Sequence, residues 1–449
     1  MFCPLSTLLR VGRPREQIVA QTNGQAVSFQ QFRADVAANI TNLSNHNVTE
    51  AVLVTADGYQ FAVGFMALLH TGCKIILPPN AQAGTLQQIS TQGCTLLTDL
   101  PDQPIANVLR MVTGHDAVHT FDDLSAEFCE IDFYTSGSTG EPKCISKKLF
   151  QIENEIEVLH RYWDTILDGT HVLSTVSHQH IYGLLMTVFW PLSSGRCFFA
   201  RPFATWEELF EVMTQSSFVV SSPAHLSRFP GSARPAADNL PKLTFSSGGP
   251  LALEAAQQCQ MILGSLPVEI FGSTETGGVA FRKQEAEDTP WVPFDVVTVR
   301  QAGSGELEVR SPYLGADKWY RLADLVKFNA NGTFSIEGRA DRIAKIEGKR
   351  VSLPQLETLL AAHTLVAEAT ALSIEDVQTT LCAVAVLTDE GRRQLEAEGA
   401  FRISRRLRRD LARDLEPAGL PKRWRFVDRI PVNSQGKREY HGLQALFEN

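Results

Sequence analysis

The segment at residues 133–143, FYTSGSTGEPK, constrains the fold of this chain more than any other. Its glycines allow several backbone N–H groups to point toward one place, its hydroxyl side chains add donors, and Lys143 adds a positive charge. This combination suits an anion such as a triphosphate. Because the segment directly follows a strand-like run, residues 129–133, we expect a phosphate-binding loop at the end of a strand.

This loop is not a Walker A loop. That motif has the order G-x-x-x-x-G-K-[ST], whereas here Gly140 is followed by Glu141 and Pro142 before the lysine arrives. A surface turn rich in serine, glycine and threonine is the alternative that composition alone leaves open. The choice between the two depends on the rest of the chain.

A chain of 449 residues is too long for one core and should divide into two or more domains. With 44% hydrophobic and 20% charged residues, it has the composition of a soluble globular protein. The formal net charge of −9 argues against a partner nucleic acid, which favours a basic surface. Residues 342–449 are formally +3 while the preceding part is −12, so the two parts differ electrostatically.

The 8 cysteines are scattered, with no C-x-x-C pair and no histidine at zinc spacing. We therefore expect reduced thiols and a cytoplasmic protein. Residues 4–9 are too few and too polar for a signal peptide. The longest apolar run, residues 181–192, falls well below the roughly 20 residues that span a bilayer, so no membrane insertion is expected.

The pattern of the first 128 residues predicts a βαβ unit. Residues 51–55 and 74–78 are short apolar runs typical of buried strands, and residues 61–69 between them have one apolar face. Gly72 fits the C-cap of that helix. Strands joined in this way run parallel, so we expect a parallel sheet.

Further along the chain, residues 149–163 predict a helix and residues 171–176 a strand. His178 and His180 follow that strand, at the end where open α/β sheets place their ligands. Two histidines two residues apart could instead bind a metal ion, but the sequence offers no third ligand nearby.

Four segments resemble, in the same order, motifs of the adenylate-forming superfamily, which includes acyl-CoA and aryl-CoA ligases and the adenylation domains of peptide synthetases. Residues 133–143 resemble [YF]-T-S-G-[ST]-T-G-x-P-K, and residues 271–275 resemble [YF]-G-x-T-E. Residues 338–351 resemble G-R-x-D-x-x-x-K-x-x-G-x-R-[VI], and residues 431–437 resemble P-x-[TN]-x-x-G-K. The resemblance implies the family's α/β fold. We expect a large N-terminal body of several subdomains with parallel and mixed sheets, residues 1–340, and a small mobile α+β lid domain, residues 341–449.

The residue types at the matched positions suit the roles that the resemblance implies. Phe271 offers a ring face to adenine, Thr274 offers a hydroxyl to the α-phosphate, and Glu275 offers an oxygen ligand to Mg²⁺. Asp324 can accept hydrogen bonds from both ribose hydroxyls, and Arg339 reaches the ribose or the phosphates. The resemblance thus assigns ATP or AMP to Thr135, Ser136, Gly137, Ser138, Thr139, Gly140, Lys143, Gly248, Gly249, Phe271, Gly272, Ser273, Thr274, Asp324, Arg339 and Lys437, with Lys143, Thr274, Glu275 and Lys437 as the catalytic set.

By the same resemblance, Asp341 is the hinge about which the small domain swings, because a few residues at the end of an element can absorb a large rotation. Lys437 then serves the adenylation step and leaves the site when the domain turns. The acyl group of the substrate is assigned to a pocket formed by His180, Tyr182, Gly183, Ser222, Ser246 and Gly248.

The sequence departs from the family pattern at two places. Leu322 and Ala323 stand where the family usually has Thr-Gly. Members that activate α-amino acids carry an aspartate near residues 177–182, and this chain has none there. An aryl or fatty acid is therefore favoured as the substrate.

The implied reaction is the activation of that acid with ATP and Mg²⁺ to an acyl-adenylate, with release of pyrophosphate, and transfer to a pantetheine thiol. An acyl carrier protein is favoured as the acceptor over coenzyme A, because the chain is short and residues 404–415 predict an arginine-rich helix suited to an acidic partner. A solvated face is the more ordinary meaning of such a charge run. Short ligases of this kind also look like those of polyketide and other secondary metabolism. A degenerate nucleotide-binding sensor is the non-catalytic alternative, which the Leu322–Ala323 replacement alone favours.

Overall fold

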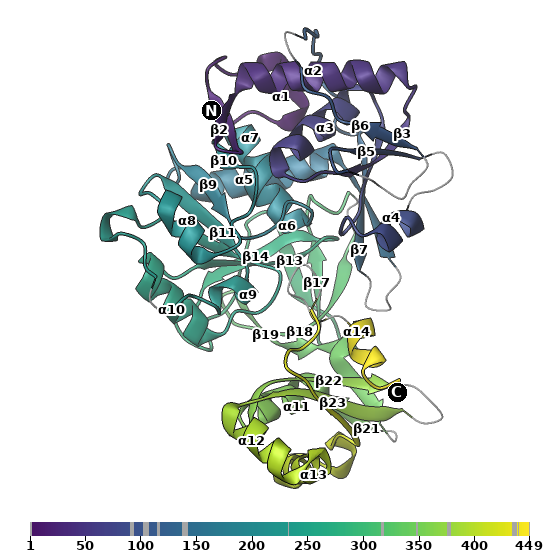
Figure 1. The fold of residues 1–449 in the computed structure, drawn as a ribbon, viewed down its shortest axis with the longest axis vertical. Helices are drawn as coiled ribbons and strands as arrows, with labels where there is room; N and C mark the ends of the chain where they lie inside the picture. Colours follow the sequence, from purple (N-terminus) through teal and green to yellow (C-terminus); the bar gives the residue numbers. More distant parts are fainter. Residues whose placement is uncertain are drawn as a thin grey trace.

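The computed structural model describes residues 2–89, 94–101, 107–114, 117–136, 142–231, 233–315, 318–346, 349–374, 379–432, 438 and 440–448. A large body is followed by a small C-terminal domain (Figure 1). The small domain lies on the side of the body where β18 (Tyr320–Phe328) and β19 (Phe334–Arg339) lie. No helix in the described ranges is both long and apolar enough to cross a membrane, and all eight cysteines are free.

The first sheet of the body has six strands in the order β6-β5-β3-β4-β7-β8. The predicted βαβ unit is confirmed, because β3 and β4 pair in parallel and α3 connects them. Gly72 follows α3 with a φ of 68°, the left-handed conformation expected at a helix end. The strands are β3 (Glu50–Val54), β4 (Lys74–Leu77), β5 (Thr95–Thr98), β6 (Val108–Arg110), β7 (Glu130–Ser136) and β8 (Pro142–Lys148).

The second sheet has nine strands in the order β15-β14-β13-β12-β11-β9-β10-β1-β2. Its central strands β13, β12, β11, β9, β10 and β1 pair in parallel, and the strands at either edge pair antiparallel. The predicted strand at 171–176 is two residues shorter than expected. The strands are β1 (Ile18–Thr22), β2 (Gln25–Ser28), β9 (His171–Ser174), β10 (Phe198–Phe199), β11 (Ser217–Ser221), β12 (Thr244–Ser246), β13 (Val268–Ser273), β14 (Gly277–Lys283) and β15 (Val292–Pro293).

A buried layer joins these two sheets. Its centre is α3, whose ring of Phe65 lies 4.6 Å from that of Phe189 in the π-helical segment η1. Nearly all of α3 is buried, including its glycines. At Gly64 a Cβ would lie 2.7 Å from the end of the Leu53 side chain of β3, so a larger residue would require that side chain to shift. The helices of the body are α1 (Leu5–Val11), α2 (Phe29–Asn45), α3 (Gly58–His70), α4 (Ala83–Ile89), α5 (Leu149–Trp163), α6 (Ile181–Leu184), η1 (Leu185–Phe189), α7 (Trp190–Ser194), α8 (Trp206–Val212), α9 (Pro223–Leu226), the 3-10 turn η2 (Ala237–Asn239) and α10 (Leu253–Leu263).

An antiparallel four-stranded sheet completes the body, in the order β16-β17-β18-β19. The small domain then has a two-stranded and a three-stranded sheet with helices. Its apolar residues form cores of their own, one centred on α11, α13 and the inner face of β22 and β23. Its elements and those of the preceding sheet are β16 (Thr298–Gln301), β17 (Glu306–Arg310), η3 (Ala340–Arg342), β20 (Ile343–Ile346), β21 (Lys349–Ser352), α11 (Leu353–Ala361), β22 (Val366–Ile374), β23 (Thr380–Leu387), α12 (Asp389–Glu398), α13 (Ala400–Leu411), η4 (Pro417–Gly419), β24 (Arg423–Phe426) and α14 (Tyr440–Ala445).

The predicted helix at residues 404–415 is displaced. The structure has α13 from Ala400 to Leu411, directly after Gly399, whose φ is 81°. The buried stripe of α13 is Ile403, Leu407 and Leu411. Leu415 lies beyond the helix end but packs against the same core.

Candidate active site

Four segments that are far apart in the sequence meet at one edge of the nine-stranded sheet. Strands β9, β11, β12 and β13 are neighbours and all run parallel, so their carboxyl ends lie at the same edge. The residues after these ends are the ones that the sequence assigned to the acyl and nucleotide sites. They are His180 after β9, Ser222 after β11, Gly248 and Gly249 after β12, and Gly272 to Thr274 at the end of β13. Such an edge is where open α/β sheets bind ligands.

The predicted acyl-pocket residues line this edge closely. The hydroxyl of Ser246, the last residue of β12, is buried and has no hydrogen-bond partner among the residues that the structure describes. Ser222 Oγ lies 2.9 Å from His225 Nδ1. Gly183 lies in α6, where a Cβ would collide with the carbonyl oxygen of Ser177, so only glycine lets this helix approach the preceding loop. Burial raises the pKa of the neighbouring Tyr182 hydroxyl well above its usual range.

The two histidines after β9 differ in their surroundings. His178 is buried, with its ring 5.4 Å from that of Phe61 and its Nε2 3.4 Å from Thr55 Oγ1. Burial lowers the pKa of His178 to about 4, so the ring is neutral at pH 7. His180 is instead the residue that precedes α6. Within the described ranges no group of three His, Cys, Asp or Glu residues could hold a metal ion.

The predicted phosphate-binding segment forms a β-hairpin. Strand β7 continues through Ser136, beyond the expected end at residue 133, and β8 begins at Pro142 and pairs antiparallel with it. Thr135 pairs with Lys143, and its hydroxyl donates to the Lys143 carbonyl at 3.4 Å. Gly137, Ser138, Thr139 and Gly140 lie outside the described residues.

Lys143 and Glu275 form an ion pair across this edge. Lys143 Nζ donates to Glu275 Oε1 at 2.6 Å, and their side chains are 55% and 22% exposed. Burial raises the pKa of Glu275, but the hydrogen bond and charge of Lys143, together with hydrogen bonds from the backbone and Ser273, hold that pKa below its ordinary value. The same hydrogen bond raises the pKa of Lys143. Tyr320, at the start of β18, lies beside both groups, a contact that the sequence alone did not indicate.

The turn that carries Thr274 and Glu275 is held by its own side chains. The backbone N–H of Ser273 donates to Thr276 Oγ1 at 3.2 Å, and the N–H of Thr276 donates to Ser273 Oγ at 3.2 Å. Thr274 and Glu275 are therefore presented from a fixed turn between β13 and β14. Phe271, earlier on β13, is half-buried, with its ring 5.6 Å from Trp291 and 6.1 Å from Phe334.

Asp324 and Arg339 are neighbours on adjacent strands. They face one another in the register of β18 and β19, and Arg339 Nη1 donates to both carboxylate oxygens of Asp324 at 3.4 Å. The Leu322–Ala323 replacement does not break β18, which runs through both residues. Leu322 packs against the core.

Open space lies beside the glycine turn after β12. Gly248 has a φ of 93°, which favours glycine. A Cβ built on Gly248 or Gly249 would meet no atom of the described residues within 4 Å. The predicted hinge Asp341 lies in the short turn η3 directly after β19, whereas Lys437 lies outside the described residues.

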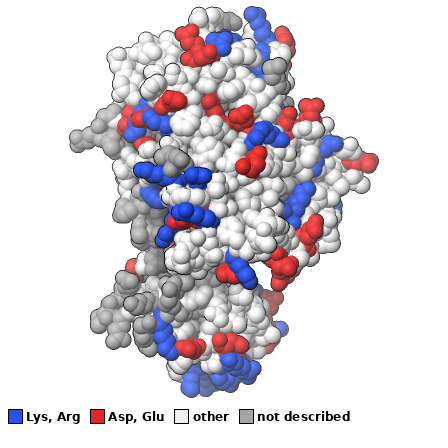
Figure 2. All heavy atoms as spheres, turned by 180° about the vertical axis from the view of Figure 1, so that it is seen from behind, with Lys and Arg blue, Asp and Glu red and all other residues white. Residues whose placement is uncertain are grey.

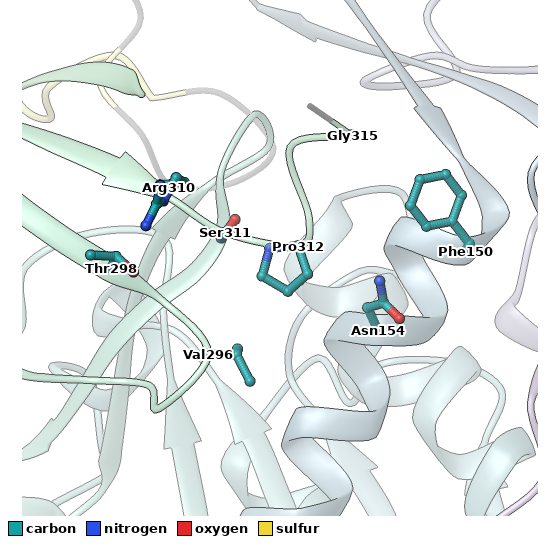
Figure 3. A pocket seen from close by; sticks show the side chains of 8 residues that line it. All are labelled: Phe150, Asn154, Val296, Thr298, Arg310, Ser311, Pro312 and Gly315. Atoms are coloured by element: carbon teal, nitrogen blue, oxygen red, sulfur yellow. The ribbon is translucent and has the colours of Figure 1, made fainter. Parts of the chain in front are cut away.

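A separate cavity of about 560 Å³ lies between α5 and the loop at residues 311–315. Phe150 and Asn154 of α5 face Pro312 across it, and Arg310 lies at its other end (Figure 3). Its lining includes none of the predicted site residues, so it is distinct from the candidate nucleotide site.

Two family models match this chain. The model described as AMP-binding enzyme matches residues 131–304, and the model described as AMP-binding enzyme C-terminal domain matches residues 355–437. Together they span more than half of the chain, in the order that the two parts of the fold have. The chain belongs to the AMP-binding enzyme family.

Two relatives of this AMP-binding enzyme are named as ligases. A probable CoA ligase, CCL8, of Humulus lupulus is 24% identical over 436 residues, covering 82% of this chain and 72% of the relative. A 4-coumarate–CoA ligase of Rhodobacter capsulatus is 27% identical over 321 residues, covering 71% of this chain and 77% of the relative. The enzyme class expected from the sequence, an AMP-forming acid–thiol ligase, is confirmed.

The fold of the AMP-binding enzyme is likewise confirmed. The solved structure of the O-succinylbenzoate coenzyme A synthetase MenE of Bacillus subtilis, in complex with ATP and magnesium, has a TM-score of 0.77 and is 18% identical, covering 99% of this chain and 100% of that chain. The large body and the small C-terminal domain are those of the adenylating-enzyme fold. The boundary between residues 340 and 341 and the individual roles of the site residues stay predictions.

Proposed function

We propose that this AMP-binding enzyme activates an aryl or fatty acid with ATP to an acyl-adenylate, releases pyrophosphate, and transfers the acyl group to a pantetheine thiol. One observation carries the proposal: Lys143 Nζ and Glu275 Oε1 lie 2.6 Å apart although 132 residues separate them. A phosphate-binding cation and a candidate metal ligand thus converge at the carboxyl edge of the parallel strands.

The residues of the turn fit a magnesium ion. Glu275 is a partly exposed carboxylate whose pKa is held below its ordinary value, and the hydroxyl of Thr274 is adjacent in the chain. Mg²⁺ is commonly held by one or two carboxylates together with phosphate oxygens of the substrate, which suits Glu275 as the metal ligand and leaves the Thr274 hydroxyl for the α-phosphate. When bound, the ion supplies positive charge to the phosphate oxygens of ATP.

The chemistry requires cations because both reactants are anions. The attacking carboxylate and the α-phosphate of ATP repel each other, and charge builds up on the phosphate oxygens in the transition state. The ammonium group of Lys143 is partly exposed and would be able to pair with a phosphate oxygen in place of the Glu275 carboxylate. Asp324 accepts hydrogen bonds from the ribose hydroxyls, and Arg339 beside it keeps that carboxylate oriented. In the same proposal, Lys437 arrives with the small domain, which pivots at Asp341.

The residues after β9 and β12 favour an uncharged acyl chain. His178 is neutral at pH 7 and buried against Phe61, and Ser246 contributes one hydroxyl. No carboxylate lies between residues 177 and 182 to pair with an ammonium group. An aryl or fatty acid therefore suits this pocket better than an α-amino acid.

We propose coenzyme A as the first acceptor. The sequence favoured an acyl carrier protein, but four relatives that each cover more than two thirds of this chain are named as CoA ligases. The carrier protein stays the second candidate, because Arg402, Arg405 and Arg409 of α13 are exposed. Seen from behind, Lys and Arg side chains gather at the far end of the small domain (Figure 2).

The test supplies ATP, Mg²⁺ and a panel of aryl, fatty and α-amino acids, with either coenzyme A or a pantetheinylated carrier protein. The proposal expects AMP and a thioester in equal amounts with an aryl or fatty acid and coenzyme A. If thioester forms only on the carrier protein, the carrier protein and not coenzyme A is the acceptor. Production of ADP, or of AMP with amino acids alone, contradicts the proposal.

A further inference from the structure

Two lysines of β8 hold Glu275 from opposite ends. Lys143 and Lys147 are four residues apart on a strand and therefore point to the same face. Lys143 Nζ donates to the carboxylate of Glu275 at 2.6 Å, and Lys147 Nζ donates to the backbone carbonyl of Glu275 at 3.1 Å. Lys147 is only 4% exposed. A buried ammonium group is costly unless it is well paired, so its presence here requires a reason.

The surroundings of Lys147 form a buried polar network. Its Nζ also donates to the carbonyl of Tyr313 at 3.2 Å, and that carbonyl accepts from Gln151 Nε2 at 2.6 Å. Glu155, one turn further along α5, is buried as well, and its Oε1 accepts from the backbone N–H of Gly278 at 2.7 Å. The network therefore links β8, α5, the loop at 311–315 and the start of β14.

Lys147 and Glu155 affect each other electrostatically, although burial has the larger effect on the pKa of each. Burial lowers the pKa of Lys147 and raises the pKa of Glu155, while the charge of each group counteracts that shift in the other. The charge of Glu275 also favours the protonated form of Lys147. A protonated Lys147 has no lone pair, so it can only donate, which suits the two carbonyls that it contacts.

The turn that carries Glu275 is therefore held in place by buried groups, while its carboxylate side faces the more exposed Lys143. Lys147 holds the carbonyl of Glu275, and Ser311 Oγ donates to the carbonyl of Thr276 at 3.3 Å. The Glu275 carboxylate points to the more exposed Lys143. Groups that orient a metal ligand in this way commonly change metal affinity by about 10- to 100-fold.

We propose that Lys147 is a positioning residue for the magnesium–nucleotide site. It fixes the backbone of Glu275 so that the carboxylate stands where the metal ion binds, and Glu155 supplies the buried counter-charge. This inference rests on the proposed function, because it takes Glu275 as the magnesium ligand. Lys147 is buried and donates to two backbone carbonyls, so it acts through Glu275.

The test measures the affinity for ATP by calorimetry across a range of Mg²⁺ concentrations, without acid or thiol. Lys147→Met keeps the length of the side chain and removes its charge. We expect the gain in ATP affinity that Mg²⁺ produces to fall by about 10-fold or more. The matched control is Lys148→Met, whose ammonium group is exposed and pairs with Glu130, and which should leave that gain unchanged.

A double-mutant cycle separates positioning from a merely structural role. In the Glu275→Gln background, the proposal expects Lys147→Met to cause no further loss of the magnesium effect, because the two residues act through one carboxylate. Equal losses in both backgrounds overturn it, as does an unchanged magnesium effect in Lys147→Met. If Lys147→Met does not fold, Glu155→Gln, which keeps an acceptor for Gly278, must show the same dependence on Glu275.

The readout also distinguishes this inference from the proposed function. A protein that binds magnesium–ATP through Glu275 but activates no acid contradicts the proposed function and leaves the cycle measurable. A protein whose ATP affinity does not respond to Mg²⁺ at all overturns the positioning of Glu275 by Lys147.

Discussion

At the scale of single residues, the ion pair of Lys143 and Glu275 controls the charge of the candidate metal ligand. Both side chains are partly exposed, so the pair adds little to stability. The ion pair matters instead for the protonation of Glu275. Burial raises the pKa of Glu275, and Lys143 makes the largest of the contributions that reverse this shift, so the carboxylate stays ionised at a lower pH than an ordinary glutamate.

Replacement of Lys143 should therefore change the pH below which magnesium-dependent ATP binding is lost. In Lys143→Met, burial of Glu275 is offset only by the hydrogen bonds from the backbone and Ser273, so the pKa of Glu275 rises and the carboxylate is protonated at a higher pH. We expect the magnesium-dependent part of ATP binding to fail at a higher pH than in the unaltered protein. Calorimetric titrations at a series of pH values measure this. A pH limit that stays in place, or moves to lower pH, contradicts the assigned role of Lys143.

His178 makes a prediction about stability. Its pKa is about 4 in the folded protein against 6.5 for the exposed side chain, so the unfolded chain binds the proton first as pH falls. Its contribution to stability is thus present above pH 6.5 and is lost on acidification toward pH 4. Between pH 7 and pH 5 this loss should be about 2 kcal/mol.

Urea unfolding at the two pH values tests this contribution. The free energy of unfolding of His178→Gln should fall less between pH 7 and pH 5 than that of the unaltered protein. Substitution of an exposed histidine, His46→Gln, is the matched control. Equal slopes for His178→Gln and the unaltered protein contradict a neutral, buried His178.

At the scale of elements, helices with a clear apolar stripe were predictable and the ends of charged ones were not. Residues 149–163 match α5 (Leu149–Trp163) because its buried positions recur at helical spacing. The arginine-rich helix begins four residues earlier than expected, because Ile403 belongs to its buried stripe and Gly399 precedes its first turn. The phosphate-binding segment was expected as a loop from residue 134 onward, but Tyr134, Thr135 and Ser136 pair with β8.

The candidate site could be predicted only in part, because its motifs name the residues that face the ligand and not those that support them. The motifs named the residues of the exposed side, such as Lys143 and Glu275. They did not indicate Lys147 or Tyr320, because a lysine in a strand usually faces solvent and the tyrosine approaches from another sheet. One signal was present for Lys147: it shares the parity of Lys143 along β8, so both had to lie on one face.

The exposed arginines of α13 make a prediction at this scale. Arg406 pairs with Glu398 and Arg408 donates to the carbonyl of Pro421, so these two hold the helix in place. Arg405 and Arg409 are exposed. If a carrier protein docks here, Arg405→Ser with Arg409→Ser should raise its KM about 10-fold at low salt and leave pyrophosphate exchange unchanged.

The matched control for this surface is on the neighbouring helix. Arg392→Ser with Arg393→Ser in α12 removes the same charge from exposed i,i+3 ion pairs. It should leave the KM for the carrier protein unchanged. If both double variants change the KM equally, α13 is not a specific docking face. Its arginines then form an ordinary solvent-exposed face.

At the scale of the whole molecule, the small domain has cores of its own and connects to the body through η3 directly after β19. A domain of this kind can turn as a unit about a short connection. The predicted hinge Asp341 lies in that connection. Two half-reactions can then use one nucleotide site in turn.

Lys437 should serve only the first half-reaction. We expect Lys437→Ala to suppress ATP–pyrophosphate exchange by about 100-fold or more, because it removes a cation from the adenylation transition state. Thioester formation from preformed acyl-adenylate should change far less. Equal losses in both half-reactions count against an alternating domain.

The most direct test of adenylate formation is exchange of labelled pyrophosphate into ATP in the absence of any thiol. We expect exchange that requires Mg²⁺ and an aryl or fatty acid, and that Glu275→Gln nearly abolishes. Exchange that proceeds without an acid, or that is retained in Glu275→Gln, would contradict it.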